Sequence, residues 1–218
     1  MRRLVPLVLA AVLAPARARA EGRELVFDMH KFEAVKQDSG PVNYYTVVED
    51  PDVGPYIHSE YKPPYETMTR GYAVPEGLRK AFHKLSWKWR AIALPEGGNE
   101  CAKDKGDSAA VIYVTWRRGL KWYAIKYVWS AVGPKGVTCD KKGFLVRAQE
   151  TVIQETGGPV NTWVTEEIDL DAEFRKHFEN GDPKADVPDF MGVGIMSDGD
   201  QTHSRSSADF AKFVLKER

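Results

Sequence analysis

Hydrophobic and polar positions form their clearest pattern between Ala109 and Ser130. Two runs rich in β-branched and aromatic residues flank the polar link 117–121, which contains Gly119. This arrangement predicts a β-hairpin. The first run is apolar at almost every position, as in a central strand that is covered on both faces. The hairpin therefore indicates an all-β domain.

The second run, residues 122–130, alternates and so has two distinct faces. One face combines the side chains of Tyr123, Ile125, Tyr127 and Trp129. The other face combines those of Trp122, Ala124, Lys126, Val128 and Ser130.

Short segments of strand-like composition occur along the rest of the chain, separated by Pro and Gly. We expect strands at 24–33, 43–48, 56–62, 86–94, 143–150, 163–170, 190–196 and 208–215. Apolar residues at helical spacing predict short helices at 78–85 and 171–178. Many short strands with one or two short helices predict a two-sheet β-sandwich that is jelly-roll-like, of the galactose-binding or concanavalin-like kind.

Two glycines interrupt the strand expected at 190–196. Met191, Val193 and Ile195 share one face, whereas Gly192 and Gly194 occupy the other. Glycine in a strand marks a place where another part of the chain approaches closely.

The first twenty residues have the pattern of a secretory signal peptide. A basic start at Arg2 and Arg3 precedes the apolar run 4–14, and Ala18-Arg19-Ala20 offers a signal peptidase site. The apolar run is shorter than the roughly 20 residues that span a bilayer, which disfavours an uncleaved anchor. We expect residues 1–20 to be removed and 21–218 to form a single domain in the periplasm or outside a bacterial cell.

Composition narrows the possible partners. The full chain has 31 basic and 31 acidic residues, and removal of 1–20 would leave 27 basic and 31 acidic, a formal charge of −4. This charge, with no basic stripe, excludes the electrostatic signature of a nucleic-acid-binding protein. No second segment predicts a membrane helix, and the oligomeric state is left open.

The two cysteines, Cys101 and Cys139, lie in polar, turn-like surroundings at the ends of the central strands. An even pair in an exported protein favours a disulfide, the alternative being two free thiols. Two cysteines without neighbouring histidines exclude a zinc site.

A run of carboxylates at 166–171 gives the enzyme hypothesis. Glu167, Asp169 and Asp171 share one strand face. The run resembles the paired acids of concanavalin-like glycoside hydrolases, in which one carboxylate is the nucleophile and another the acid/base. It implies a polysaccharide hydrolase or lyase that uses Glu167 and Asp169. The competing interpretation is structural, with Asp171 as the N-cap of the following helix.

Asp198 and Asp200 flank Gly199 in a polar loop. Their carboxylates suit calcium, which prefers several oxygen ligands, although the spacing is not that of an EF-hand. The alternative is a tight turn in which the Asp side chains bond the local backbone.

Aromatic residues are abundant in the predicted strands, which contain all six tryptophans. Most must fill the core, but a minority, such as Trp122 with Lys126, can face solvent and stack against sugar rings. We select Lys126, Trp129, Asp198 and Asp200 as candidate ligand-binding residues. For Lys126 the alternative is a salt bridge to a carboxylate such as Asp198.

Five segments together resemble an uncharacterised family of exported bacterial proteins. They are Trp87-x-Trp89, the run 107–114, Lys126-Tyr127-Val128-Trp129-Ser130, Trp163-x-x-Glu166 and Ser197-Asp198-x-Asp200-x-Thr202. The resemblance covers residues 78–215, with Ser197 in place of a Thr and with cysteines outside the pattern. It implies export and a β-sandwich, and it implies no activity.

The sequence contains no nucleophile elbow, zinc-protease motif or phosphate-binding loop. We therefore predict a non-catalytic binding domain for a glycan or cell-envelope polymer, with calcium as the one candidate cofactor. The alternatives are the polysaccharide-acting enzyme and a structural envelope protein with a protein partner.

Overall fold

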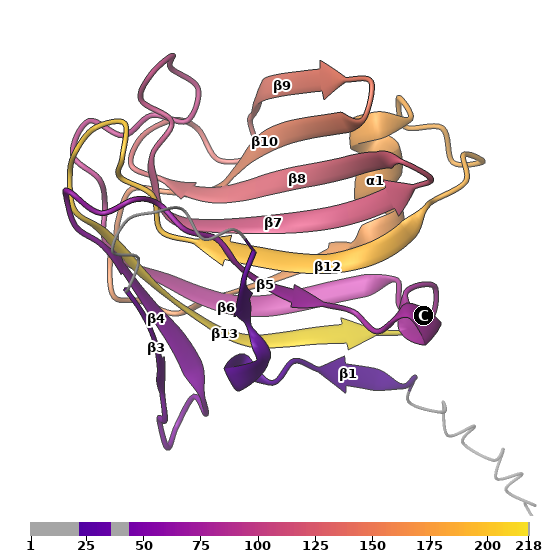
Figure 1. Ribbon diagram of the computed structural model, residues 1–218, viewed down its shortest axis with the longest axis horizontal. Coiled ribbons are helices and arrows are strands. Elements are labelled where there is room, and N and C mark those ends of the chain that lie inside the picture. Colours follow the sequence, from indigo (N-terminus) through magenta and orange to yellow (C-terminus); the bar gives the residue numbers. More distant parts are fainter. Residues whose placement is uncertain (1–21, 36–43, 218) are drawn as a thin grey trace, which may run out of the picture.

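The computed structural model describes residues 22–35 and 44–217 and shows two β-sheets packed face to face (Figure 1). The expected signal peptide lies outside the described residues. No helix in this part of the chain is long and apolar enough to cross a membrane. The sandwich predicted from the sequence, jelly-roll-like and nearly all-β, is confirmed.

One sheet has six strands among the described residues. Its order is β11 (Val164–Asp169), β6 (Lys84–Ala93), β13 (Ser206–Lys216), β4 (Tyr56–Tyr61) and β3 (Tyr45–Val48), with β1 (Glu24–Val26) beside β13.

The other sheet has seven strands in the same described ranges. Its order is β2 (Glu33–Ala34), β5 (Arg70–Ala73), β12 (Asp189–Met196), β7 (Ser108–Arg118), β8 (Lys121–Ser130), β10 (Arg147–Thr156) and β9 (Thr138–Phe144). The predicted hairpin is β7–β8, at the middle of this sheet.

The core lies between the two sheets and is rich in aromatic rings. Trp87 and Trp89 project from β6, and the Tyr127 and Trp129 rings of β8 lie 5.8 Å from them, centroid to centroid. All four side chains are buried, so the Tyr123-to-Trp129 face of β8 points inward. Large aromatic rings supply much of the buried area that holds such sandwiches together.

Helix α1 (Leu170–Phe178) follows β11 and packs against the inner face of the seven-stranded sheet. Its Phe174 ring contacts Trp116 and Tyr123. The N-cap is Asp169, whose carboxylate accepts a hydrogen bond from the Ala172 amide at 2.9 Å, and this corrects the expected cap at 171.

The helix predicted at 78–85 is absent. A 3₁₀ turn occupies Glu76–Leu78, and β6 begins at Lys84. Leu85 is fully buried in β6, which pairs with both β11 and β13. The hydrogen-bonded pairing of β6 with a strand on each side outweighs the helix propensity of this segment, whose helical spacing covers little more than two turns.

The strand predicted at 24–33 is two strands in different sheets. β1 pairs with β13 and β2 pairs with β5. Between them a 3₁₀ turn, Met29–Lys31, is capped by the carboxylate of Asp28, so the chain crosses from one sheet to the other. The strand expected at 143–150 is likewise a hairpin of β9 and β10.

Gly192 shows the close approach expected from the sequence. Its φ is +146°, and a Cβ there would collide with the carbonyl oxygen of Tyr72 on β5. Both constraints require glycine. β5 therefore lies tightly against β12, with no side chain between them at this point.

Candidate functional site

The outer face of the seven-stranded sheet presents its side chains in ordered rows. The registers of β7, β8 and β10 align three neighbours at a time: Arg117, Trp122 and Arg147; then Thr115, Ala124 and Gln149; then Tyr113, Lys126 and Thr151. These residues alternate with core residues, so each row faces away from the other sheet.

The neighbouring strands on this face carry almost no side chains. Gly192 and Gly194 of β12 lie opposite Thr115 and Tyr113, and Ala73 and Gly71 of β5 continue the pattern. A Cβ at Gly194 would lie 2.9 Å from the Thr69 methyl carbon. Because atoms of neighbouring segments fill the places of these side chains, the surface here stays low and forms a depression beside the longer side chains of β8 and β10.

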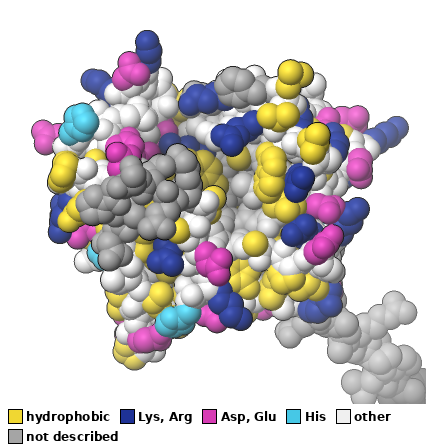
Figure 2. Space-filling model, viewed as in Figure 1, with side chains coloured by type: hydrophobic (Ala, Val, Ile, Leu, Met, Phe, Trp, Pro, Cys, Tyr) yellow, Lys and Arg dark blue, Asp and Glu magenta, His cyan; other side chains and the backbone are white. Residues whose placement is uncertain are grey.

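This depression is a groove of about 900 Å³. Segments 31–35 and 69–75 form one side, and Trp122, Arg147 and Gln149 lie on the other. The space-filling view shows the face hollowed between these parts, with hydrophobic and basic side chains at its margin (Figure 2). Its volume falls in the range of about 300–1,000 Å³ typical of small-molecule sites.

Trp122 is the exposed aromatic residue of the groove. The residue is 40% exposed to solvent. The Arg117 guanidinium lies 5.3 Å from the centre of the indole ring, a cation–π contact. The expectation that Trp122 can face solvent agrees with this placement.

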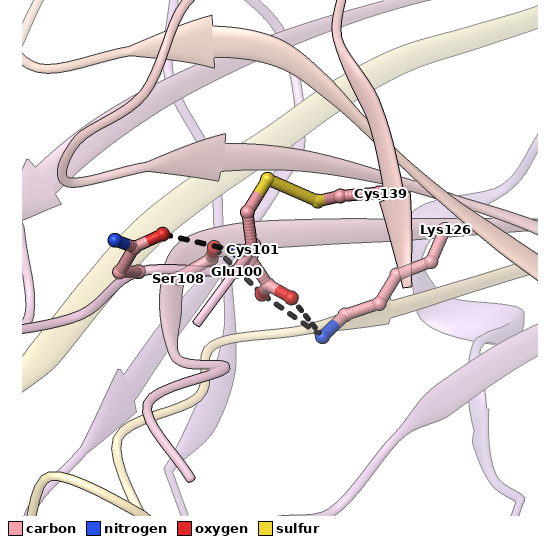
Figure 3. The surroundings of a disulfide bond; sticks show 6 residues. Glu100, Cys101, Ser108, Lys126 and Cys139 are labelled. Atoms are coloured by element: carbon pink, nitrogen blue, oxygen red, sulfur yellow. Dashed lines mark hydrogen bonds and ion pairs between the residues drawn. A yellow bond between two sulfur atoms is a disulfide. The ribbon is translucent and has the colours of Figure 1, made fainter. Parts of the chain in front are cut away.

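Lys126 lies farther along the same face but is buried. Its Nζ donates to both carboxylate oxygens of Glu100 at 2.9 Å, and Ser108 Oγ donates to one of them at 2.8 Å (Figure 3). The partner expected from the sequence was Asp198. Glu100 occupies that role because the Cys101–Cys139 disulfide, next to it in the chain, joins the loop to β9.

Charge balance explains the protonation state of this lysine. Burial alone lowers the pKa of the Lys126 ammonium, but the neighbouring Tyr113 and Glu100 outweigh burial and raise it. Lys126 therefore remains charged, and its role is to neutralise buried carboxylates.

Three aspartates gather beside this ion pair. Carboxylate oxygens of Asp107, Asp198 and Asp200 lie within 4.8 Å of one another. Asp107 is fully buried and accepts hydrogen bonds from the Thr202 amide and hydroxyl, each at 2.6 Å. Asp198 accepts one from Thr67 Oγ1 at 2.9 Å. Oxygen ligands of this kind suit calcium.

Burial raises the pKa of Asp198 to about 7, with Asp200 and Asp107 adding to the effect and Lys126 opposing it. A carboxyl with a raised folded-state pKa binds its proton more tightly in the folded than in the unfolded chain. Its ionisation therefore costs stability as the pH rises from about 4 to about 7.

We expect the free energy of unfolding to fall as the pH rises from about 5 to about 7 and to level off above that, and the Asp198→Asn variant to flatten the fall. Urea titrations in metal-free buffer with a chelator measure both. Asp104→Asn, at a side chain that is 84% exposed, is the control and should keep the wild-type slope. Parallel curves for wild type and Asp198→Asn would contradict the assignment.

Trp129 does not lie in the groove, which corrects the sequence prediction for this residue. It is 2% exposed, and its Nε1 donates to the Gly157 carbonyl oxygen at 2.8 Å. Alternation along β8 places it on the core face, opposite to Trp122.

Glu167 and Asp169 have structural contacts on the edge strand of the other sheet. The Glu167 carboxylate accepts from Lys216 at 3.1 Å and from Lys84 at 3.4 Å, and the Lys216 hydrogen bond leads the causes that lower its pKa. Asp169 caps α1. These contacts support the structural interpretation of the carboxylate run.

Sequence reasoning missed Arg117, Arg147, Gln149 and Glu100. The first three lie on strand faces that alternation could have assigned once the register was known. Glu100 is 26 residues from Lys126 in the chain, so no local pattern links them.

Comparison with known proteins identifies the family. Residues 45–214 match the family described as "Protein of unknown function (DUF3047)", and the chain belongs to this family. No curated protein matches the chain.

Solved structures share its general outline at low identity. The family 11 carbohydrate-binding module of the cellulosomal cellulase Lic26A-Cel5E of Clostridium thermocellum is 11% identical, with 91% of this chain and 97% of that chain covered and a TM-score of 0.48. The xyloglucanase domain of NopAA, a type three effector from Sinorhizobium fredii, is 11% identical, with 90% and 99% covered and a TM-score of 0.43. Endoglucanase 3 of Trichoderma harzianum, from family GH12, is 10% identical, with 93% and 100% covered and a TM-score of 0.43. These similarities assign no function to this chain.

Proposed function

We propose that this member of the DUF3047 family is an exported, non-catalytic domain that binds a glycan or a cell-envelope polymer in the groove on its seven-stranded sheet. The observation that carries the proposal is the groove itself, with an exposed indole at one side and a floor of glycine and alanine. An apolar ring beside polar side chains matches a sugar, which has apolar C–H faces and polar edges.

The remaining groove residues fit this assignment. Gln149 and Thr115 place an amide and a hydroxyl in the row next to Trp122. The amide can donate and accept hydrogen bonds with sugar hydroxyls, whereas the Thr115 hydroxyl already donates to the Gly192 carbonyl oxygen at 3.0 Å and so offers an acceptor. Gly71 and Gly194 let Val35 and Thr69 pack directly against the sheet, which brings these two segments to the side of the groove.

The positions of the carboxylates relative to the groove favour a binding domain over a hydrolase. Glu167 and Asp169 belong to the six-stranded sheet, and both are engaged by neighbours. Among the described residues that line the groove, Glu33 is the one carboxylate, so this part of the chain does not supply the pair of acids that glycoside hydrolysis requires there.

We expect Trp122→Ala to weaken glycan binding about tenfold or more, because buried aromatic anchors dominate many interfaces. Isothermal titration of the purified protein with cellohexaose, chitohexaose, hexagalacturonate and poly(glycerol phosphate) measures the affinities. Trp163→Ala is the matched control, since Trp163 contacts Tyr56 and Arg90 of the six-stranded sheet.

The control should bind as the wild type does. Equal loss in both variants, or no loss in Trp122→Ala, would refute the groove as the site. Failure of the wild-type protein to bind any of the four polymers would refute the proposed function and favour a structural protein with a protein partner.

A further inference from the structure

Two arginines lie on either side of Trp122 in the row at one end of the groove; Arg147 lines the groove with Trp122, and Arg117 lies just outside it. Arg117 on β7 and Arg147 on β10 are both in direct register with this indole on β8. The Trp122 amide donates to the Val146 carbonyl oxygen at 3.0 Å, which extends the pairing of β8 with β10 at this point. Adjacent strands are about 4.8 Å apart, so the two arginine backbones are about 10 Å apart.

Both guanidinium groups lack a carboxylate partner among the residues that the structure describes. The Arg117 Nε donates to the Gly119 carbonyl oxygen at 2.8 Å, and its guanidinium contacts the indole. Asp189, in register with Arg117 on β12, lies 3.4 Å from Lys80 instead. Arg147 is exposed and has no ion pair with a described residue.

Two nearby basic residues do have carboxylate partners. Arg118 Nη1 lies 2.9 Å from Glu179 Oε1, and Lys141 Nζ lies 2.9 Å from Glu150 Oε1. The first pair joins β7 to the end of α1, and the second joins β9 to β10. The two arginines beside Trp122 therefore differ from Arg118 and Lys141 in having no described carboxylate partner.

The other charged residues on the described lining of the groove are Lys31 and Glu33, so Glu33 offsets one of the two arginines and leaves the other as excess positive charge. Lys31 and Glu33 line the opposite side, and Lys31 already has Asp28 at 3.9 Å. A guanidinium presents a planar set of donors that matches a carboxylate or a phosphate. A sugar ring on Trp122 would direct its substituents toward Arg117 and Arg147.

We propose that the groove selects acidic glycans: a sugar ring stacks on Trp122 while its carboxylate or phosphate group is bound by Arg147 and Arg117. This inference rests on the proposed function, because it specifies the charge of the ligand of the same groove. The anionic group can belong to a uronic acid or to a phosphodiester, and the probes below separate the two.

The test compares two forms of one sugar backbone that differ in charge, and adds a phosphodiester polymer. Hexagalacturonate and its fully methyl-esterified form share one sugar backbone, and poly(glycerol phosphate) supplies the phosphodiester. We expect one of the two anionic polymers to bind about tenfold or more tightly than the methyl ester, and added salt to reduce that difference. Preference for hexagalacturonate identifies a carboxylate ligand, and preference for poly(glycerol phosphate) a phosphate ligand.

The variant Arg147→Gln removes one guanidinium from an exposed position, so the fold should be preserved. We expect it to lose most of the preference for the anionic polymer while leaving affinity for the methyl ester nearly unchanged. Lys88→Gln is the matched control, because it removes one positive charge from β6, in the other sheet. It should retain the wild-type preference.

Equal affinity for the charged and esterified hexamers, with no binding of poly(glycerol phosphate), overturns the selection of acidic glycans. The same holds if Arg147→Gln and Lys88→Gln reduce the preference equally. In both cases binding of neutral glycans that depends on Trp122 leaves the proposed function intact. Absence of binding to all of these polymers contradicts both proposals together.

Discussion

Replacing Lys126 with methionine is expected to lower the free energy of unfolding by about 3–5 kcal/mol. The substitution leaves Glu100, which is 5% exposed, without its ammonium partner. It also removes the positive charge that opposes the raised pKa of Asp198. An uncompensated buried carboxylate costs far more than a lost surface pair, because it has left water without gaining a counter-charge.

Urea denaturation measures this loss, and Lys216→Met is the matched control. Lys216 pairs with Glu167, but both side chains are more than a third exposed. An exposed pair contributes about 0–1 kcal/mol. In a double-mutant cycle, Glu100→Gln should recover part of the loss in Lys126→Met. Equal effects of the two lysine substitutions would mean that the buried pair is not a major contributor to stability.

Removal of the Cys101–Cys139 disulfide is expected to cost about 4 kcal/mol, from the entropy of an unfolded chain that is no longer closed over this loop. The two cysteines are 38 residues apart, and their Cα atoms are separated by 5.4 Å. The bond joins the loop that carries Glu100 to edge strand β9, so its loss should also loosen the contact between Glu100 and Lys126 (Figure 3).

Urea titration of Cys101→Ser/Cys139→Ser in comparison with the oxidised wild type measures this effect. Reduction of the wild-type protein with dithiothreitol should shift its midpoint to that of the double variant, and dithiothreitol should leave the double variant unchanged. A loss below about 1 kcal/mol would show that the unfolded chain gains little freedom when the bond is absent.

The central hairpin could be predicted from the sequence because its signals are local. Alternation on β8 separates Tyr123 and Tyr127 from Trp122 and Lys126. The structure buries Tyr127 against the other sheet and Tyr123 against α1. Gly192 was also informative, since glycine within a strand indicates close backbone approach. Both features depend on a few neighbouring residues, which is where pattern analysis is strongest.

The groove could not be predicted because it depends on strand order. β5, β12, β7, β8 and β10 are adjacent in the sheet, but their residues come from distant parts of the chain. Arg147 reaches Trp122 only through the parallel pairing of β10 with β8. Lys126 likewise pairs with Glu100, which comes from a polar loop, and no spacing rule relates the two.

The selection of Trp129 shows a different error. The residue stands in a run with Lys126, and its type suits sugar stacking, but it lies three positions away and so on the opposite face of the strand. Trp122, the residue of the proposed site, is four positions from Lys126 and shares its face. Strand alternation therefore predicts which side chains share a face, whereas residue type alone does not.

The most direct test of the central claim is the NMR signal of each tryptophan indole N–H during titration with a glycan that the protein binds. The chain has six tryptophans, and the signal missing from Trp122→Ala identifies Trp122. The account predicts that the Trp122 signal shifts in proportion to binding while those of the buried Trp87, Trp89 and Trp129 stay nearly fixed. A shift confined to Trp163, on the other sheet, or binding with no shift at Trp122, would contradict the groove as the glycan site.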